Sequence, residues 1–229
     1  MQPMRNATRF AADRPLDIVC LGRFGVDFYA QQIGARLEDV TSFAKYLGGS
    51  SANTAFGCAR LGLAVGLISR VGDDAMGRFL TETIAREGCD VSHVGVDTSR
   101  LTAAVVLGIE DKETFPLIFL RENCADMALG DAEIEARYIA QARVLLITGT
   151  HFSTEYIAGI SNRALDRAHA HDVRTVLDID YRPVLWGLPK RGHGAPPYPP
   201  SDTAPSHLPR VPPPFDFCTR PAPRSPPAR

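Results

Sequence analysis

The sequence predicts an α/β protein in which a mostly parallel sheet is flanked by helices. Between residues 15 and 188, short apolar runs that suit buried strands alternate with amphipathic segments that suit helices. Glycines separate many of these segments, as expected for turns. Strands that are joined by helices run parallel and are covered on both faces of their sheet.

The first half of this region predicts three strands and two helices. The run 16–22 is apolar and ends at a glycine, which suits a buried strand, and 64–72 has the same character. A shorter strand is expected at 91–96. Residues 51–62 predict a helix that stops at a glycine, and 75–88 carries apolar residues at helical spacing before another glycine.

The second half begins with two strands that have no helix between them. Residues 103–109 and 115–121 predict a hairpin joined by a polar turn, and we interpret it as a flap outside the main sheet. The alternation then resumes, with expected elements as follows: a helix at 131–141, a strand at 144–149, a helix at 155–171 and a strand at 175–180.

Composition narrows the class of protein. The chain has 229 residues, 45% of them hydrophobic, and a net charge of −1, so it indicates neither a nucleic-acid nor a membrane partner. No apolar run reaches membrane-spanning length. The five cysteines are scattered, which favours reduced thiols and a cytoplasmic location. The polar residues 1–14 are expected to be flexible.

The composition changes sharply near Leu188. Residues 1–188 contain four prolines, whereas 189–229 contain the other fourteen. This proline- and arginine-rich segment has few large apolar residues with which to offset chain entropy. We therefore expect a disordered tail at 189–229.

Two clusters of charged residues follow predicted strands, where ligands collect in parallel α/β sheets. Asp27 follows the strand 16–22, and its carboxylate could accept hydrogen bonds from two hydroxyl groups. Arg182 follows the strand 175–180 and could bind a carboxylate or phosphate with two parallel bonds. The alternatives are a surface aspartate in a glycine turn and an Asp–Arg surface pair.

A third cluster opens the helix 51–62. Gly48 and Gly49 would let the backbone approach a ligand closely, and Ser50 or Ser51 could cap the helix. Asn53 would lie in the first turn, where its amide offers donors and an acceptor to a polyol. An ordinary glycine loop with a serine cap is equally compatible with the pattern.

Several other kinds of site are excluded or not favoured. The sequence has no Walker P-loop, no G-x-S-x-G nucleophile motif, and neither H-E-x-x-H nor paired C-x-x-C for zinc, so no metal site is expected. It also lacks a G-x-G-x-x-G dinucleotide fingerprint. His151 follows a strand, and we interpret it as structural.

These clusters together resemble the ribokinase-like (PfkB) family of carbohydrate kinases. Gly48-Gly49 leads to Asn53-Thr54-Ala55, and Gly62 and Gly72 follow at the family's spacing, with Ser51 as the one departure. "RVGDDAMGRFL" (70–80) is a typical continuation. Within the family, "FPLIFLRENCADMAL" (115–129) and "LDIDYRPVLWGL" (177–188) resemble 5-dehydro-2-deoxygluconokinases, and 2-keto-3-deoxygluconate kinases carry similar segments. The resemblance covers about residues 15–188.

The resemblance implies a ribokinase-like fold and an ATP- and Mg²⁺-dependent reaction. The γ-phosphoryl group would pass to the 6-hydroxyl of 5-dehydro-2-deoxy-D-gluconate, a sugar acid of inositol catabolism. It further implies that 102–121 forms a β-lid through which two subunits can pair. The residues implied to bind the substrate fall into two groups: Asp27, Gly48, Gly49 and Asn53 for the sugar hydroxyls, and Arg121 and Arg182 for acidic groups.

One family motif is missing. The Gly-Ala-Gly-Asp sequence, whose Asp is the general base, does not occur, and the two Gly-Asp pairs, 72–73 and 130–131, lack its context. Because the resemblance stops near Leu188, we expect a frameshift or truncation and a chain without kinase activity. The competing interpretations are a non-catalytic sugar-acid binder and a Rossmann-type oxidoreductase, and the missing dinucleotide fingerprint counts against the latter.

Overall fold

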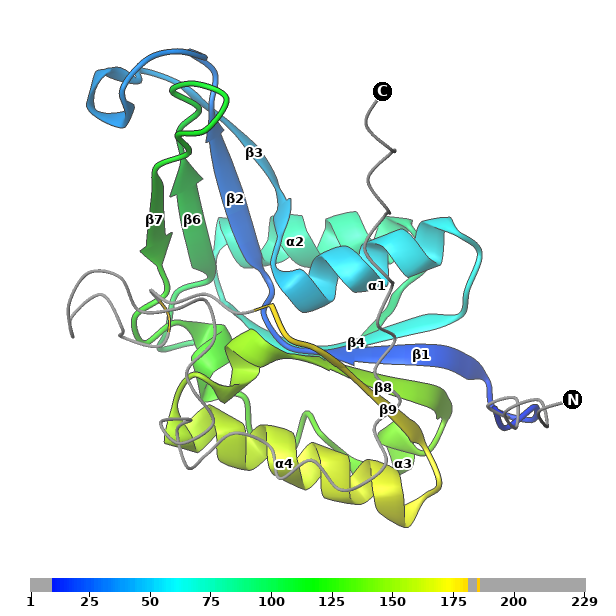
Figure 1. Ribbon diagram of the computed structural model, residues 1–229. Helices are drawn as coiled ribbons and strands as arrows, with labels where there is room; N and C mark the ends of the chain where they lie inside the picture. The colour runs from blue at the N-terminus through cyan, green and yellow to red at the C-terminus, as the bar shows by residue number, and fades with distance from the viewer. Residues whose placement is uncertain (1–9, 181–184, 186–229) are drawn as a thin grey trace, which may run out of the picture.

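A five-stranded parallel sheet forms the body of the protein. The computed structural model describes residues 10–180 and 185 (Figure 1). The strands of this main sheet lie in the order β5-β4-β1-β8-β9, and all neighbouring pairs run parallel. Their bounds are β1 Leu16–Leu21, β4 Val65–Gly72, β5 Asp90–Asp97, β8 Ala142–Thr148 and β9 Arg174–Asp178. The parallel α/β architecture expected from the sequence is confirmed.

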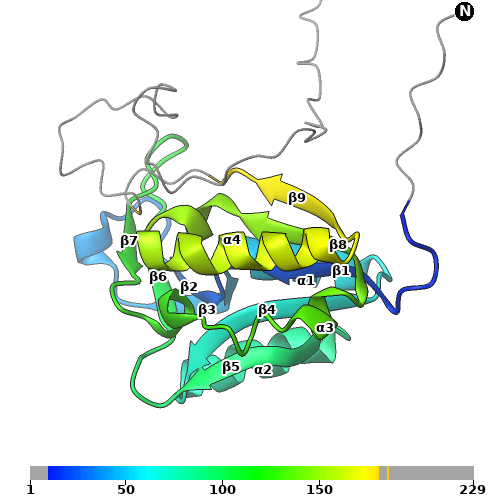
Figure 2. The ribbon, with the colours of Figure 1, turned by 90° about the horizontal axis from the view of Figure 1, so that it is seen from below.

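Helices cover both faces of the main sheet (Figures 1 and 2). One face carries α1 (Ser50–Arg60) and α2 (Ala75–Arg86), and the other carries α3 (Ala136–Ile139) and α4 (Glu155–Ala170). Each of these layers therefore buries one side of every central strand.

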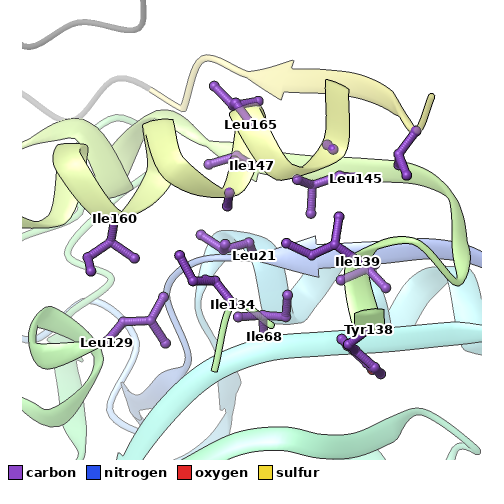
Figure 3. Close-up of a cluster of buried hydrophobic side chains, with 14 of the residues drawn as sticks. Leu21, Ile68, Leu129, Ile134, Tyr138, Ile139, Leu145, Ile147, Ile160 and Leu165 are labelled. Carbon is purple, nitrogen blue, oxygen red and sulfur yellow. The ribbon is translucent and has the colours of Figure 1, made fainter. Parts of the chain in front are cut away.

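The core consequently consists of two clusters separated by the sheet. Leu145 and Ile147 of β8 point into the cluster under α3 and α4, shown in Figure 3, whereas the intervening Leu146 belongs to the cluster under α1 and α2. Val19 and Leu21 of β1 alternate with Cys20 in the same way. This two-residue alternation is the geometry of a strand buried on both faces.

A second, four-stranded sheet projects from one end of the body (Figure 1). We call it the lid sheet, and its strands lie in the order β3-β2-β6-β7. Their bounds are β2 Gly25–Ala30, β3 Phe43–Gly48, β6 Ala103–Leu107 and β7 Leu117–Leu120. The hairpin β6–β7 is antiparallel and lies outside the main sheet, as predicted, whereas β2 and β3 are strands that the sequence patterns did not indicate.

The helix expected at 131–141 is the clearest error in the prediction. Only Ala136–Ile139 is α-helical. Glu133 explains the difference, because its Oε2 accepts a hydrogen bond from the Gly130 amide at 2.9 Å while its Oε1 lies 3.1 Å from Nη1 of Arg70. These bonds hold the preceding residues in a turn against β4.

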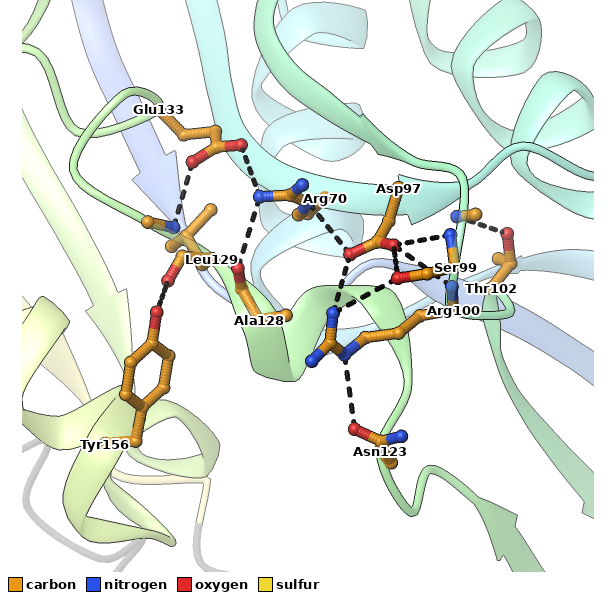
Figure 4. Close-up of polar contacts among 12 residues, drawn as sticks. Arg70, Asp97, Ser99, Arg100, Thr102, Asn123, Ala128, Leu129, Glu133 and Tyr156 are labelled. Carbon is orange, nitrogen blue, oxygen red and sulfur yellow. Dashed lines mark hydrogen bonds and ion pairs between the residues drawn. The ribbon is translucent and has the colours of Figure 1, made fainter.

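A network of charges braces the base of the lid sheet (Figure 4). Asp97, at the end of β5, lies 3.3 Å from Arg70 Nε and 3.2 Å from Arg100 Nη1. Its Oδ1 accepts hydrogen bonds from the hydroxyl and amide of Ser99. Hydrogen bonds from Ser99, followed by the charges of Arg70 and Arg100, lower the pKa of Asp97 to about 2, so it is ionised near neutrality.

Asp74 connects α2 to the start of β6. Its Oδ1 caps the helix by accepting hydrogen bonds from the amides of Met76 and Gly77, and its Oδ2 accepts one from the Thr102 amide at 2.8 Å. Partial burial opposes ionisation of this carboxylate, but the donors of Thr102, Gly77 and Met76 outweigh it and lower its pKa. Asp74, the last residue of the "GDD" segment 72–74, therefore links the body to the lid sheet by hydrogen bonds.

Some expectations lie outside the described residues. They concern Arg182, the segment 189–229 and the first nine residues of the N-terminal segment 1–14. These stay predictions.

Candidate functional site

The candidate site lies where the chain crosses between the main sheet and the lid sheet. The chain makes four such crossings, at 22–24, at 49, at 98–102 and at 121–124. The first follows the carboxyl end of β1, and β8 ends beside it. Crossings at strand ends bring side chains from distant parts of the sequence to one edge of the sheet, where α/β proteins bind ligands.

Asp27 and Gly48 meet at this edge. Asp27 lies within β2 and not beyond the end of a strand, which corrects the sequence-based placement. In the antiparallel pair, Gly25 lies opposite Gly48, so Asp27 is on the same face two residues away. A Cβ atom on Gly48 would overlap the Asp27 carboxylate. The glycine is therefore required for the Asp27 carboxylate to lie against Gly48, the residue before the N-cap of α1.

Gly49 begins α1 without a side-chain cap. Its φ is 102°, and a Cβ atom there would overlap the carbonyl oxygen of Arg23, so the position requires glycine. The expected serine cap is wrong. Ser50 Oγ donates to Thr148 Oγ1 at 3.0 Å, and Ser51 Oγ donates to the Leu21 carbonyl at 2.7 Å. These hydrogen bonds connect the start of α1 to the ends of β8 and β1.

Asn53 lies in the first turn of α1, as predicted, and its side chain is exposed. Its amide nitrogen donates to the Gly49 carbonyl at 2.8 Å. The structure therefore brings Asp27, Gly48, Gly49 and Asn53 into one region.

Arg121 follows β7 and is buried together with an acid. Its Nε donates to Asp126 Oδ2 at 2.8 Å, and its Nη2 lies 2.7 Å from the same oxygen. The two side chains are 4% and 0% exposed. Asp126 was not predicted from the sequence, although an acid five residues after a candidate arginine was a usable signal.

Two further residues at the site are buried: Arg23 was not predicted from the sequence, and His151 was interpreted as structural. Arg23 lies in the first crossing and is 8% exposed, and burial followed by the nearby Arg121 lowers its pKa. His151 follows β8 and is fully buried. Burial, together with the charges of Arg121 and Arg23, holds the pKa of His151 well below its usual range, so its ring is neutral.

The described part of the chain limits other kinds of site. Within residues 10–180, no three His, Cys, Asp or Glu side chains are grouped so that they could hold a metal ion. In the same residues, no helix is both long enough and apolar enough to span a bilayer.

The sequence matches a known family over most of its length. The model of the pfkB family carbohydrate kinases matches residues 15–190. A 5-dehydro-2-deoxygluconokinase of Bacillus thuringiensis (strain Al Hakam) is 38% identical over 182 residues, or 79% of this chain and 55% of the relative. The chain belongs to the PfkB carbohydrate kinase family. It spans about half the length of the curated relatives that it matches.

Solved structures share the fold of this chain. A PfkB protein from Polaromonas sp. JS666 has a TM-score of 0.70 and 32% identity, with 76% of this chain and 59% of that chain covered. A putative ribokinase II from E. coli, in complex with ATP and Mg²⁺, has a TM-score of 0.69 and 20% identity over 76% of this chain and 56% of that chain. The second likeness concerns the fold alone.

Proposed function

We propose that this chain forms the sugar-acid-binding part of a cytoplasmic PfkB kinase that acts on 5-dehydro-2-deoxy-D-gluconate. The observation that carries the proposal is the convergence, beside the lid sheet, of a hydroxyl-binding group and a cationic group. Asp27 and Asn53 suit the hydroxyls of a polyol, and the buried arginines beside them suit a carboxylate. The name of the Bacillus relative supports this choice of sugar acid.

The alternative substrate within this class is 2-keto-3-deoxygluconate. Both compounds carry one carboxylate and several hydroxyls, so the same residues would serve either. Comparing the two sugar acids in one binding assay decides between them, and the proposal requires tighter binding of 5-dehydro-2-deoxy-D-gluconate.

ATP and Mg²⁺ are the expected co-substrate and metal of the complete kinase reaction. The E. coli neighbour binds both. Within the described residues, no three His, Cys, Asp or Glu side chains are grouped to hold a metal ion, and the sequence has no Gly-Ala-Gly-Asp to supply a general base. We therefore propose that the 229-residue chain binds the sugar acid but does not phosphorylate it.

A binding measurement combined with a turnover measurement tests this proposal. Sugar acid at one hundred times its Kd would stabilise the folded chain by about 2.7 kcal/mol, which raises Tm by about 5–10 °C for a chain of this size. Asn53→Ala should abolish most of that shift, whereas Asn162→Ala on α4 is the matched control and should preserve it. ADP release coupled to NADH oxidation should stay at background, and sustained release would contradict the expected inactivity.

We also propose that the chain forms a homodimer through its lid sheet. It exposes large apolar side chains on its two edge strands: Phe43, Tyr46, Leu117, Ile118 and Leu120. Pairing of two lid sheets would cover this surface. Light scattering should show a dimer for the wild type and a monomer for Leu117→Lys/Leu120→Lys, and a monomeric wild type would contradict the proposal.

A further inference from the structure

Arg23 is held in a fixed position between the two sheets. Its carbonyl oxygen accepts a hydrogen bond from the Ala52 amide at 3.4 Å and packs against Gly49. Its guanidinium carbon lies 5.6 Å from the centre of the Phe119 ring on β7. The backbone is therefore fixed by the body, and the side chain lies against the lid sheet.

The guanidinium group of Arg23 is buried without a charged partner in contact. The residue is 8% exposed, its Nε is fully buried, and that atom has no hydrogen-bond partner among the described residues. Within residues 10–180, no ion pair involves Arg23 at 4.0 Å or less. Burying a charge in this way is costly unless another group compensates for it.

The neighbouring groups do not remove this cost. Arg121 adds a second positive charge, and its guanidinium group already forms an ion pair with Asp126. Asp27, Asp126 and Asp180 act on Arg23 as more distant negative charges. The neutral His151 contributes no charge. Arg121 is therefore neutralised locally, whereas Arg23 is not.

Other polar atoms of this cluster also lack partners. Among the described residues, Asp126 Oδ1 and both ring nitrogens of His151 are buried without hydrogen bonds. Such atoms are few in folded proteins, and several of them together call for a bound water, ion or polar ligand. Arg23 Nε has no partner, and a carboxylate can accept hydrogen bonds from Nε and a neighbouring Nη of an arginine in two-point geometry.

We propose that Arg23 binds the carboxylate of the sugar acid and makes the site selective for acids over neutral sugars. This inference rests on the proposed function. It assigns selectivity to the arginine in the β1–β2 crossing, while Arg121 is a positioning residue whose charge Asp126 neutralises. His151 is placed beside the same cluster and offers one neutral ring N–H to the bound anion.

The test compares two probes of nearly the same size, one with a carboxylate and one with a neutral amide in its place. Isothermal titration measures binding of 5-dehydro-2-deoxy-D-gluconate and of its primary amide to the full chain. The wild type should bind the acid at least about tenfold more tightly than the amide. Arg23→Met should weaken acid binding about 10- to 100-fold and change amide binding by less than about threefold. Arg23→Lys should lie between the two.

A matched control separates selectivity from packing. Arg60 also lies 5.6 Å from an aromatic ring, that of Phe56, but on the exposed side of α1. Arg60→Met should leave the binding of both probes unchanged. In the absence of ligand, Arg23→Met should melt at or above the wild-type temperature, because it removes a buried and uncompensated charge.

Three outcomes would overturn the inference. Retained preference for the acid in Arg23→Met would show that another group binds the carboxylate. Equal loss of acid and amide binding, with a lower Tm, would show that Arg23 only supports packing. Failure of the wild type to bind either probe would overturn the proposed function, and this inference with it.

Discussion

The buried pair Arg121–Asp126 makes the sharpest prediction about stability. Both side chains are at most 4% exposed, and Arg121 Nε and Nη2 lie 2.8 and 2.7 Å from the same carboxylate oxygen. Removing one partner of such a pair leaves an uncompensated buried charge and costs about 3–5 kcal/mol. Asp126→Ala should lie at the upper end of that range, because it leaves Arg121 beside the buried Arg23.

The assay is a double-mutant cycle measured by urea unfolding at neutral pH. Asp126→Ala and Arg121→Met should each lower the free energy of unfolding by about 3–5 kcal/mol, which corresponds to about 6–20 °C in Tm. The double variant should cost much less than the sum, because neither charge is then left alone. Asp73→Ala, which breaks the exposed pair with Arg78, is the control and should cost about 0–1 kcal/mol. Additive costs in the cycle would refute the coupling.

Three further predictions follow from the same geometry. Gly48→Ala should weaken sugar-acid binding at least about tenfold and lower the free energy of unfolding by about 1–3 kcal/mol, because the added Cβ displaces the Asp27 carboxylate. Unchanged titration curves for sugar-acid binding would contradict this prediction. The pKa of Asp97 is depressed to about 2, so its contribution to stability is complete above about pH 4 and disappears as the pH falls toward 2. The difference in unfolding free energy between wild type and Asp97→Asn should shrink over that window, and a constant difference would refute the assignment. Asp74→Ala should lower the free energy of unfolding by about 2–4 kcal/mol in urea, because it removes the cap of α2 and leaves the Thr102 amide without its acceptor. A loss below about 1 kcal/mol would contradict a linking role for Asp74.

The body of the fold was predictable because its central strands are buried on both faces. The runs at 16–22, 64–72 and 144–149 are mainly apolar and appear as β1, β4 and β8. The lid strands β2 and β3 were missed because they are only partly buried and have mixed polarity. Asp27 was consequently placed in a loop, although its proximity to the glycine pair was anticipated.

The candidate site was predictable only where a local pattern marks it. The glycine pair and Asn53 stand in a recognisable motif, and the structure places them together. Arg23 has no such motif, because its significance lies in burial without a partner, a property of tertiary packing. Asp126 was missed because its role also depends on tertiary packing: it lies in a short 3-10 helix, Ala125–Ala128, that places it against Arg121.

The most direct test of the account is equilibrium titration of the full 229-residue chain with 5-dehydro-2-deoxy-D-gluconate in the absence of nucleotide. The account predicts saturable binding that is weakened by both Asn53→Ala and Arg23→Met and preserved in Asn162→Ala. Absence of saturable binding to a folded wild-type chain would contradict the assignment of a sugar-acid site to these residues.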